Sequence, residues 1–347
     1  MPPPVPVFPS PPTYTLTDNT KLQNAVAAGV RAVVAAKSSH PAAPFALTLI
    51  DAGMKRVGGF NEDREHYSAS ILKAGALYAA HALLDMVTRY NNARTPASAA
   101  DLFKGLRKEM NDTILAGSSL IRGGFSDDKY RLPHYEDVFA VTKVGTRLTV
   151  DFRTRYKNAL DNMPDSDAEA SVSIQGLGYS YINGVLERAG FFRPADKKGL
   201  WLGGDYAAWP QVRIACDNDG DTAQGATSRT IAHLVAVMLL DNNLPASSHV
   251  HMTTWLEKSA HGGHPSLFLR DEVANRLRKE QVTHGKIGVG ELGRNRKGPT
   301  IFAESSMLKG VGSLPYVASF LNINYGPYAI DDAIDAIKEA IRIYETP

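Results

Sequence analysis

The stretch Tyr67-Ser68-Ala69-Ser70-Ile71-Leu72-Lys73 leads into the apolar run from Ala74 to Leu84. If that run is a helix, Ser70 lies in its first turn and Lys73 lies one turn later on the same face, within reach of the hydroxyl. A serine hydroxyl is too weakly acidic to attack a carbonyl at neutral pH. A lysine can take its proton once burial or a neighbouring cation lowers the pKa of the amine. The pattern therefore predicts a nucleophilic serine.

The spacing Ser-x-x-Lys occurs two more times, from Ser126 to Lys129 and from Ser306 to Lys309. Only the copy at Ser70 begins a long apolar helix after strand-like segments. The alternative interpretation is an exposed lysine on a helix that has a serine in its first turn. The residues further along the chain favour the catalytic interpretation.

The segment from His284 to Gly293 contains Lys286-Ile287-Gly288, a Lys-x-Gly step among apolar and β-branched residues. Two strand-like segments follow, Thr300 to Glu304 and Tyr316 to Ile323. With Ser70 and Lys73, this arrangement resembles the penicillin-recognising serine hydrolases, and among them the class A β-lactamases. The resemblance extends over most of the chain, with an enlarged segment in the middle.

The resemblance implies an α/β (α+β) protein of the β-lactamase/transpeptidase type, with an antiparallel sheet, terminal helices and an inserted all-helical subdomain. The two ends of the chain agree with this fold, because apolar residues recur at helical spacing in both. At the N-terminal end they follow the candidate N-caps Thr17 and Asp18. We expect an extended Pro-rich arm (1–16), an α/β subdomain (17–68 and 280–347) and a helical subdomain (69–279). They form one domain with two lobes, with the site in the cleft between them. The helix and strand signals are Leu22, Val26, Val30 and Val33; Phe45 to Asp51; Lys55 to Phe60; and Ile330, Ile334, Ile337 and Ile341.

The resemblance assigns a role to each residue of the site. Lys73 takes the proton of the Ser70 hydroxyl, and Lys286 is a neighbouring cation that can attract a substrate carboxylate. The oxyanion lies between the backbone N–H groups of Ser70 and Val289, next to Gly288.

The family's Ser-Asp-Asn motif is absent. In the matching stretch, Leu177-Gly178-Tyr179 replaces it, and Asn183 falls on a family asparagine. Tyr179 is the first candidate to relay a proton to the leaving group, and Ser180 and Tyr181 come next. The open alternative is that all three residues serve only in packing or in a turn.

The family's Glu-x-x-Leu-Asn loop is also absent. Asp205 and Asp217 are the candidate substitutes for its glutamate, and the favoured alternative for each is that it caps a turn. Ile287 stands where the family has a hydroxyl residue. We therefore expect an esterase, amidase or transacylase that acts on a small acyl compound through an acyl-enzyme on Ser70, with weak or no β-lactam turnover. The alternatives are an inactive ligand-binding member of the fold and a β-lactamase with an unusual deacylation base.

The composition fits one domain with a full core, since the 347 residues are 44% apolar and 21% charged. A net charge of +2 gives no reason to expect nucleic acid. Cys216 is the single cysteine, so no intrachain disulfide forms. We expect no cofactor, no metal and no membrane span, and the oligomeric state stays open. The start lacks a secretory pattern, which fits either a cytoplasmic protein or one whose signal has been removed.

Other clusters carry weaker signals. The run Asp217 to Asp221 resembles a calcium loop, but its glycine is misplaced, so an acidic turn is expected. The histidine pairs at 249/251 and 261/264 are expected to be exposed in loops rather than to bind a metal. The segment from Leu102 to Asp165 carries Phe125, Tyr130, Tyr135 and Phe139, and it is a candidate to cover the cleft or to contact a second subunit.

Overall fold

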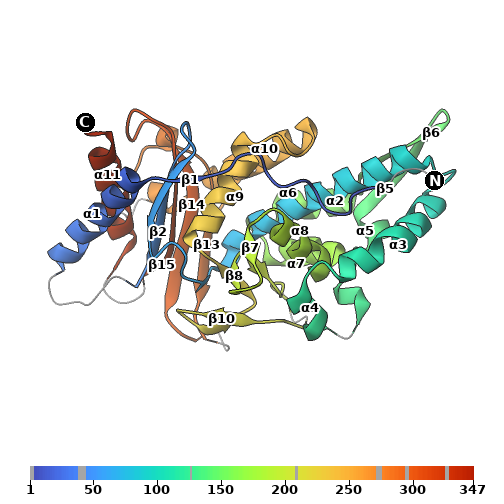
Figure 1. The fold of residues 1–347 in the computed structure, drawn as a ribbon, viewed down its shortest axis with the longest axis horizontal. Helices are drawn as coiled ribbons and strands as arrows, with labels where there is room; N and C mark the ends of the chain where they lie inside the picture. The colour runs from blue at the N-terminus through green and yellow to red at the C-terminus, as the bar shows by residue number, and fades with distance from the viewer. Residues whose placement is uncertain are drawn as a thin grey trace.

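The computed structural model describes residues 4–37, 44–125, 127–207, 210–270, 276–293, 297–324 and 328–347. The molecule is elongated, with a β-sheet and the terminal helices at one end and a mainly helical lobe at the other (Figure 1). The predicted fold class is confirmed: an antiparallel sheet is flanked by the terminal helices, and a second lobe is inserted between its strands.

The main sheet has the strand order β1-β3-β2-β15-β14-β13. All neighbouring strands are antiparallel except β1 and β3, which are parallel. Strands from the two ends of the chain therefore pair in its centre, and β13 lies at one edge. The bounds are β1 (Thr17–Asp18), β2 (Ala46–Asp51), β3 (Arg56–Phe60), β13 (Val282–Glu291), β14 (Thr300–Leu308) and β15 (Tyr316–Ile323).

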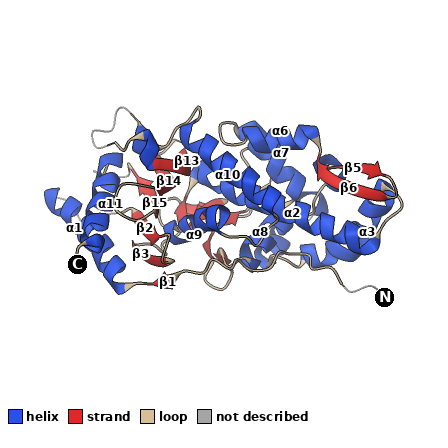
Figure 2. Ribbon diagram, turned by 90° about the horizontal axis from the view of Figure 1, so that it is seen from above, coloured by secondary structure: helices blue, strands red, loops and turns tan. Residues whose placement is uncertain are grey.

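Helices α1 (Thr20–Ala36) and α11 (Ile330–Glu345) pack against each other on one face of the sheet (Figures 1 and 2). The N-cap of α1 is Asn19, whose side-chain oxygen accepts a hydrogen bond from the backbone N–H of Leu22. The prediction of Thr17 or Asp18 as the cap is wrong, because both residues pair with β3. Asn19 follows them directly and takes the extended conformation that a cap requires.

The other face of the sheet is covered by α9 (Ser228–Leu240), and α10 (Ala246–His261) packs on β13. Between them and the second lobe runs α2 (Lys73–Arg94), whose first residues are all buried. By length and composition the helix Ala69–Arg94 could cross a membrane, but 83% of its apolar window is buried inside the protein, as in a core helix. It joins the two lobes.

The inserted lobe is not entirely helical as predicted, because short strand pairs close several of its turns. Residues Phe139 to Phe152 form an antiparallel hairpin around Gly145, whose φ of 64° suits a tight turn. The helices are α3 (Ala99–Leu115), α4 (Ser119–Gly124), α5 (Tyr135–Val138), α6 (Thr154–Asn162), α7 (Asp167–Leu177) and α8 (Tyr179–Arg188). The strands are β4 (His66–Tyr67), β5 (Phe139–Val144), β6 (Arg147–Phe152), β7 (Phe192–Arg193), β8 (Lys198–Gly199), β9 (Trp201–Leu202), β10 (Ile214–Cys216), β11 (Gly220–Thr222) and β12 (Gln224–Ala226).

The aromatic residues of the enlarged segment belong to the core of this lobe. Phe125, Tyr135 and Phe139 are buried, and Tyr130 packs against the same cluster. Phe125, Tyr135 and Phe139 thus contribute to the core of the lobe rather than to its surface.

The N-terminal arm packs along the length of the molecule (Figure 1). The ring of Phe8 is buried and stacks on that of Tyr181, with 5.8 Å between the centroids. At the far end of the arm, the backbone N–H of Thr13 donates a 2.7 Å hydrogen bond to Asp241. The arm thus joins the helical lobe to α1.

Candidate active site

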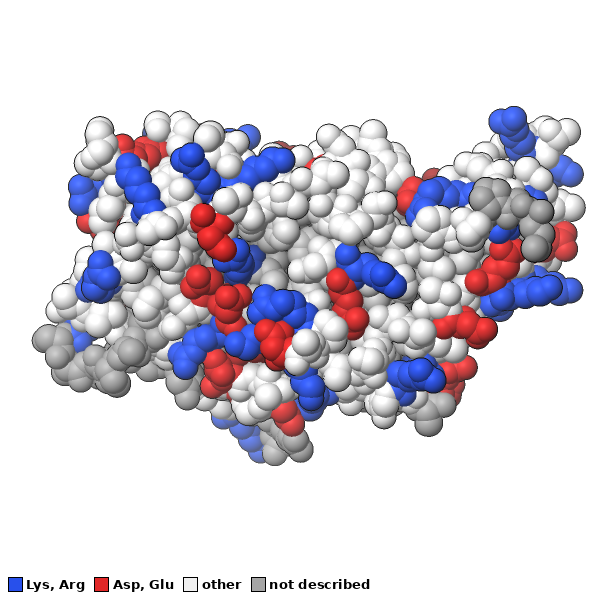
Figure 3. All heavy atoms as spheres, in the orientation of Figure 1, with Lys and Arg blue, Asp and Glu red and all other residues white. Residues whose placement is uncertain are grey.

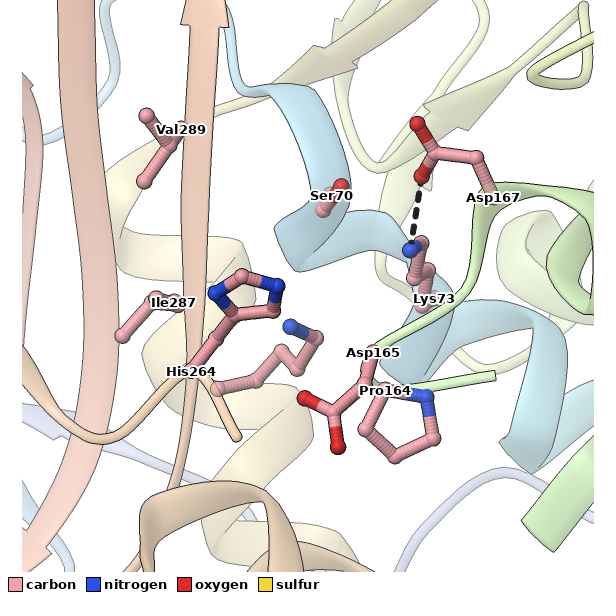
Figure 4. Close-up of a pocket in the computed structure, with 9 residues that line it drawn as sticks. Ser70, Lys73, Pro164, Asp165, Asp167, His264, Ile287 and Val289 are labelled. Atoms are coloured by element: carbon pink, nitrogen blue, oxygen red, sulfur yellow. Dashed lines mark hydrogen bonds and ion pairs between the residues drawn. The ribbon is translucent and has the colours of Figure 1, made fainter. Parts of the chain in front are cut away.

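A cavity of about 280 Å³ lies where the edge strand β13 meets the start of α2. Its walls come from four parts of the chain: the turn before α2 with the first residue of α2, strand β13, the connection between α6 and α7 with the first residue of α7, and the loop after α10 (Figure 4). The lining residues are Ser70, Lys73, Pro164, Asp165, Asp167, His264, Lys286, Ile287 and Val289. The structure therefore brings Ser70, Lys73, Lys286 and Val289 to one place.

Ser70 lies in a short 3-10 turn, η1 (Ala69–Leu72), that leads into α2. The preceding residue, Ala69, has a φ of 52°, in the left-handed region that non-glycine residues rarely occupy. The hydroxyl of Tyr206 donates a 3.1 Å hydrogen bond to the carbonyl of Ala69 and holds this turn. Such strain persists only where the surroundings fix it, and it is common at functional sites.

Strand β13 lies against this turn because of its glycines. A Cβ atom at Gly288 would lie 2.4 Å from the carbonyl oxygen of Ser68 and 3.1 Å from the backbone nitrogen of Ile71. A Cβ atom at Gly290 would lie 2.5 Å from the Tyr67 hydroxyl. Glycine at both positions therefore lets the edge strand approach Ser70, and Gly288 contributes backbone rather than a side chain.

Lys73 is buried and forms an ion pair with Asp167, with 2.8 Å between Nζ and Oδ1. Its Nζ also lies 4.9 Å from the ring centroid of Tyr206. The ion pair requires the ammonium form, which has no lone pair with which to accept a proton. Lys73 acts as a base only after it leaves Asp167.

Lys286 is also buried, and no more than 2% of it is exposed. Burial, and then the charge of Lys73, lower the pKa of Lys286 to about 7, against the opposing attraction of Asp165, Asp167 and Glu304. An amine with that pKa carries a lone pair in a large fraction of molecules near neutral pH. Lys286 is thus the second amine in the cavity that can accept a proton.

Beneath the cavity, Glu304 of β14 is fully buried, and burial raises the pKa of its carboxyl to about 7. Its side chain accepts hydrogen bonds from the hydroxyls of Ser266 and Ser306 and, at 2.8 Å, from the backbone N–H of Leu267. These contacts anchor the start of η3 (Leu267–Leu269) to the sheet. His264 lies two residues before Ser266, so the same anchor positions the histidine.

His264 and Asp165 line the cavity, and neither was predicted as a site residue. The imidazole of His264 and the carboxylate of Asp165 both point into the cavity (Figure 4). A Cβ atom at Gly262 would lie 3.5 Å from Oδ2 of Asp165, so the two loops approach each other at its mouth. The sequence signals were His261-Gly262-Gly263-His264 and Pro164-Asp165-Ser166-Asp167, two turn-rich stretches with polar ends.

The predicted proton-relay residues do not line the cavity. Tyr179 is buried and stacks on Phe125 with 5.1 Å between the ring centroids, and Ser180 and Tyr181 are buried as well. Asn183 donates to the carbonyls of Tyr179 and Leu202. Because Gly178 starts α8 directly after α7, the first turn of α8 packs into the helical lobe.

The candidate deacylation bases are likewise engaged elsewhere. Asp205 is buried, and its carboxylate accepts hydrogen bonds from Gln175 and from the backbone N–H of Ala207. Asp217 forms an ion pair with Arg64, and it begins the turn that joins β10 and β11. Neither side chain lines the cavity.

Of the other two Ser-x-x-Lys copies, Ser126 lies outside the described residues. Ser306 is buried in β14, where its hydroxyl binds Glu304. Both ends of the copy at Ser70, the serine and Lys73, line the cavity.

The histidines at 249, 251 and 261 lie in α10, so the prediction of exposed loop residues is wrong for these three. Nε2 of buried His81 lies 2.9 Å from Nδ1 of His251, and Nε2 of His251 lies 2.7 Å from Oδ1 of Asp161. The helical periodicity of Met252, Trp255 and Leu256 runs through these positions. Among the residues that the structure describes, no group of three or more His, Cys, Asp or Glu could hold a metal ion.

No protein-family model and no curated protein matches the chain. Solved structures that are similar include a class A β-lactamase from Mycobacterium abscessus, with 12% identity, a TM-score of 0.47 and coverage of 93% of this chain and 97% of that chain. A β-lactamase from Desulfarculus baarsii DSM 2075 has 13% identity, a TM-score of 0.49 and coverage of 92% and 96%. The β-lactamase from Streptomyces albus G has 13% identity, a TM-score of 0.47 and coverage of 93% and 98%.

Proposed function

We propose that the protein is a serine hydrolase or acyltransferase of the β-lactamase-like type that works through an acyl-enzyme on Ser70. The observation that carries the proposal is that the Ser70 side chain and two buried lysines, Lys73 and Lys286, line one cavity. A buried lysine pair supplies what a serine nucleophile lacks, because repulsion between the two ammonium groups favours a neutral amine on one of them.

In the first step, Oγ of Ser70 attacks the acyl carbon, and its proton passes to the neutral lysine. Lys286, whose pKa is lowered to about 7, takes the proton while Lys73 stays paired with Asp167. This exchanges the roles that the resemblance gave to the two lysines. The leaving alcohol or amine takes up a proton from the lysine or from His264, and an ester on Ser70 remains.

In the second step, water or another acceptor attacks the ester, and the proton returns to Ser70. The acidic side chains that line the cavity, Asp165 and Asp167, are the groups available to assist water. The aspartates that could have replaced the family's glutamate are held in other contacts. We therefore propose slow deacylation by water and weak or absent β-lactam turnover.

The experiment that tests the proposal is intact-protein mass spectrometry after incubation with an alkyl fluorophosphonate, with peptide mapping of the adduct. We expect one adduct, located on Ser70, that is absent in Ser70→Ala. Ser247→Ala, on the exposed surface of α10, is the matched control and should label like the wild type. An adduct that persists in Ser70→Ala, or no adduct at all, would favour the inactive binding protein.

The same variants also test whether the protein is a β-lactamase with an unusual deacylation base. Turnover of a chromogenic cephalosporin that disappears in Ser70→Ala would identify a β-lactamase with an unusual base. A β-lactam adduct that persists for hours on the wild type is the result we expect.

A further inference from the structure

The charges of the cavity are divided between its floor and its mouth. The two lysines, Lys73 and Lys286, are buried, each with no more than 2% exposed. The two carboxylates belong to exposed residues: Asp165 lies in the connection between α6 and α7, and Asp167 is the first residue of α7. A substrate that enters the cavity meets the carboxylates first.

Of these two carboxylates, Asp167 is neutralised by its ion pair with Lys73. For the carboxylate of Asp165, the part of the chain that the structure describes provides neither a hydrogen bond nor an ion pair. It stands next to the glycines of the loop after α10, where a Cβ atom at Gly263 would lie 3.6 Å from its Cγ. Because glycine has no side chain, space remains beside this carboxylate.

The cavity is poorly suited to a substrate carboxylate. Ile287 lines the wall and offers no hydroxyl donor. The attraction between Asp165 and Lys286 shows that an anion placed on Lys286 would also feel the repulsion of Asp165. The face of the molecule in Figure 3 carries acidic and basic side chains interspersed, without a broad basic patch.

We propose that the acyl donor of this site carries a protonated amine, which binds to Asp165 at the mouth of the cavity while its acyl carbon meets Ser70. This inference rests on the proposed function and specifies its substrate class. It distinguishes the site from one that anchors its substrate by a carboxylate. Small amides or esters of amino acids with a free amine are compounds of this class.

The test compares diphenyl alkylphosphonates that differ only in the end of the alkyl chain: an ammonium, a methyl or a carboxylate group, with three to five carbons in the chain. Oγ of Ser70 displaces one phenol from phosphorus, and the proton of the hydroxyl leaves with the phenol, so each reagent reports one covalent step. The labelling rate of Ser70 is measured by mass spectrometry. Charge recognition at an exposed carboxylate predicts labelling about fivefold faster for the ammonium reagent than for the methyl reagent. The carboxylate reagent should be slowest.

In Asp165→Asn, the ratio of the ammonium rate to the methyl rate should fall toward one. Asp137→Asn, at an exposed aspartate that lies outside the cavity, is the matched control and should keep the wild-type ratio. Raising the ionic strength should also lower the ratio in the wild type.

Labelling of Ser70 at equal rates by all three reagents, or fastest by the carboxylate reagent, would overturn the inference and leave the acyl-transfer function standing. An unchanged ratio in Asp165→Asn would do the same. If neither these reagents nor the fluorophosphonate labels Ser70, the proposed function itself fails.

Discussion

Nζ of Lys73 lies 2.8 Å from Oδ1 of Asp167, and the two side chains differ greatly in exposure: 3% for the lysine and 64% for the aspartate. A buried ammonium is thus stabilised by a carboxylate that water can reach. Because Asp167 also favours the protonated form of Lys286, one exposed residue influences both amines.

Replacing Asp167 by Asn should shift the pH dependence of Ser70 labelling. Without the carboxylate, the ammonium form of Lys286 loses a favourable interaction, so Lys286 releases its proton at lower pH. The midpoint of the rise in labelling rate with pH should therefore shift to lower pH. The shift should be only roughly half a pH unit, because the carboxylate is well solvated. Labelling by the fluorophosphonate between pH 5.5 and 9 measures it, with Asp137→Asn as the control. A shift to higher pH would contradict this electrostatic role.

Replacing Lys286 by Met should stabilise the protein near neutral pH. The pKa of Lys286 is about 7 in the folded state against 10.5 for the free group, so the unfolded state binds more protons between these values. The wild type should therefore gain stability as the pH rises from 7 toward 10.5. Below pH 7 the folded state bears the full free-energy cost of burying the Lys286 ammonium. The Met variant lacks this penalty and should be more stable by about 1 to 2 kcal/mol at pH 7.

Urea unfolding at pH 7 and pH 9.5 measures this difference. The gain of the Met variant over the wild type should shrink at the higher pH, and its labelling of Ser70 should be lost. A Met variant that is less stable than the wild type at pH 7 would show that burial of Lys286 does not cost stability. Lys286→Arg keeps the charge, and its labelling rate tells whether a neutral amine is required.

Replacing Gly288 by Ala should separate β13 from the turn that carries Ser70. The new Cβ atom would lie 2.4 Å from the Ser68 carbonyl, so the strand or the turn must move. Overpacking of this kind costs about 1 to 3 kcal/mol. The labelling rate of Ser70 should fall by about 100-fold, because a small displacement of the nucleophile is enough.

Gly123→Ala is the control, since a Cβ atom there meets nothing within 4 Å and the residue lies in α4. This variant should be as stable as the wild type or slightly more stable. Equal labelling by Gly288→Ala and Gly123→Ala would refute the idea that the close approach of β13 forms the site.

Replacing His81 by Gln should reduce the sensitivity of the fold to acid. Burial, and then His251, lower the pKa of His81 to about 3, whereas the free group has a pKa of 6.5. Between these values the unfolded state takes up the proton, so stability falls as the pH falls, by about 1.4 kcal/mol per pH unit at most. Gln keeps a donor toward His251 and does not titrate. Its urea midpoint should depend less on pH between 6.5 and 4, and His134→Gln serves as the surface control.

Much of the fold was predictable because its signals are local. The helices at both ends repeat isoleucine or valine at helical spacing, and the strand-like segments on either side of Ala52 to Met54 pair with each other. The helical lobe was less predictable. Its short strand pairs are only two to six residues long, and tertiary packing rather than propensity decides such pairs.

Some residues of the candidate site could be predicted from the sequence, and others could not. Ser70, Lys73 and Lys286 stand in spaced motifs, and the structure brings them together. Asp165 and His264 lie about 100 positions apart in turn-rich segments, and their approach depends on the anchor of Ser266 to buried Glu304. No local pattern encodes a contact of that kind. Tyr179 stands in the sequence where the family motif would be, but it begins α8 and its side chain is buried in the core.

The pairing of β2 with β15 and of α1 with α11 has a consequence for synthesis on the ribosome. The first strands of the main sheet must wait for partners that are synthesised about 270 residues later, since Leu49 pairs with Ala318. At translation rates of about 5 to 20 residues per second, that delay is on the order of ten seconds to one minute. During this time the edge of β2 that will bind β15 is unpaired, so the main sheet is completed late in synthesis relative to its first strands.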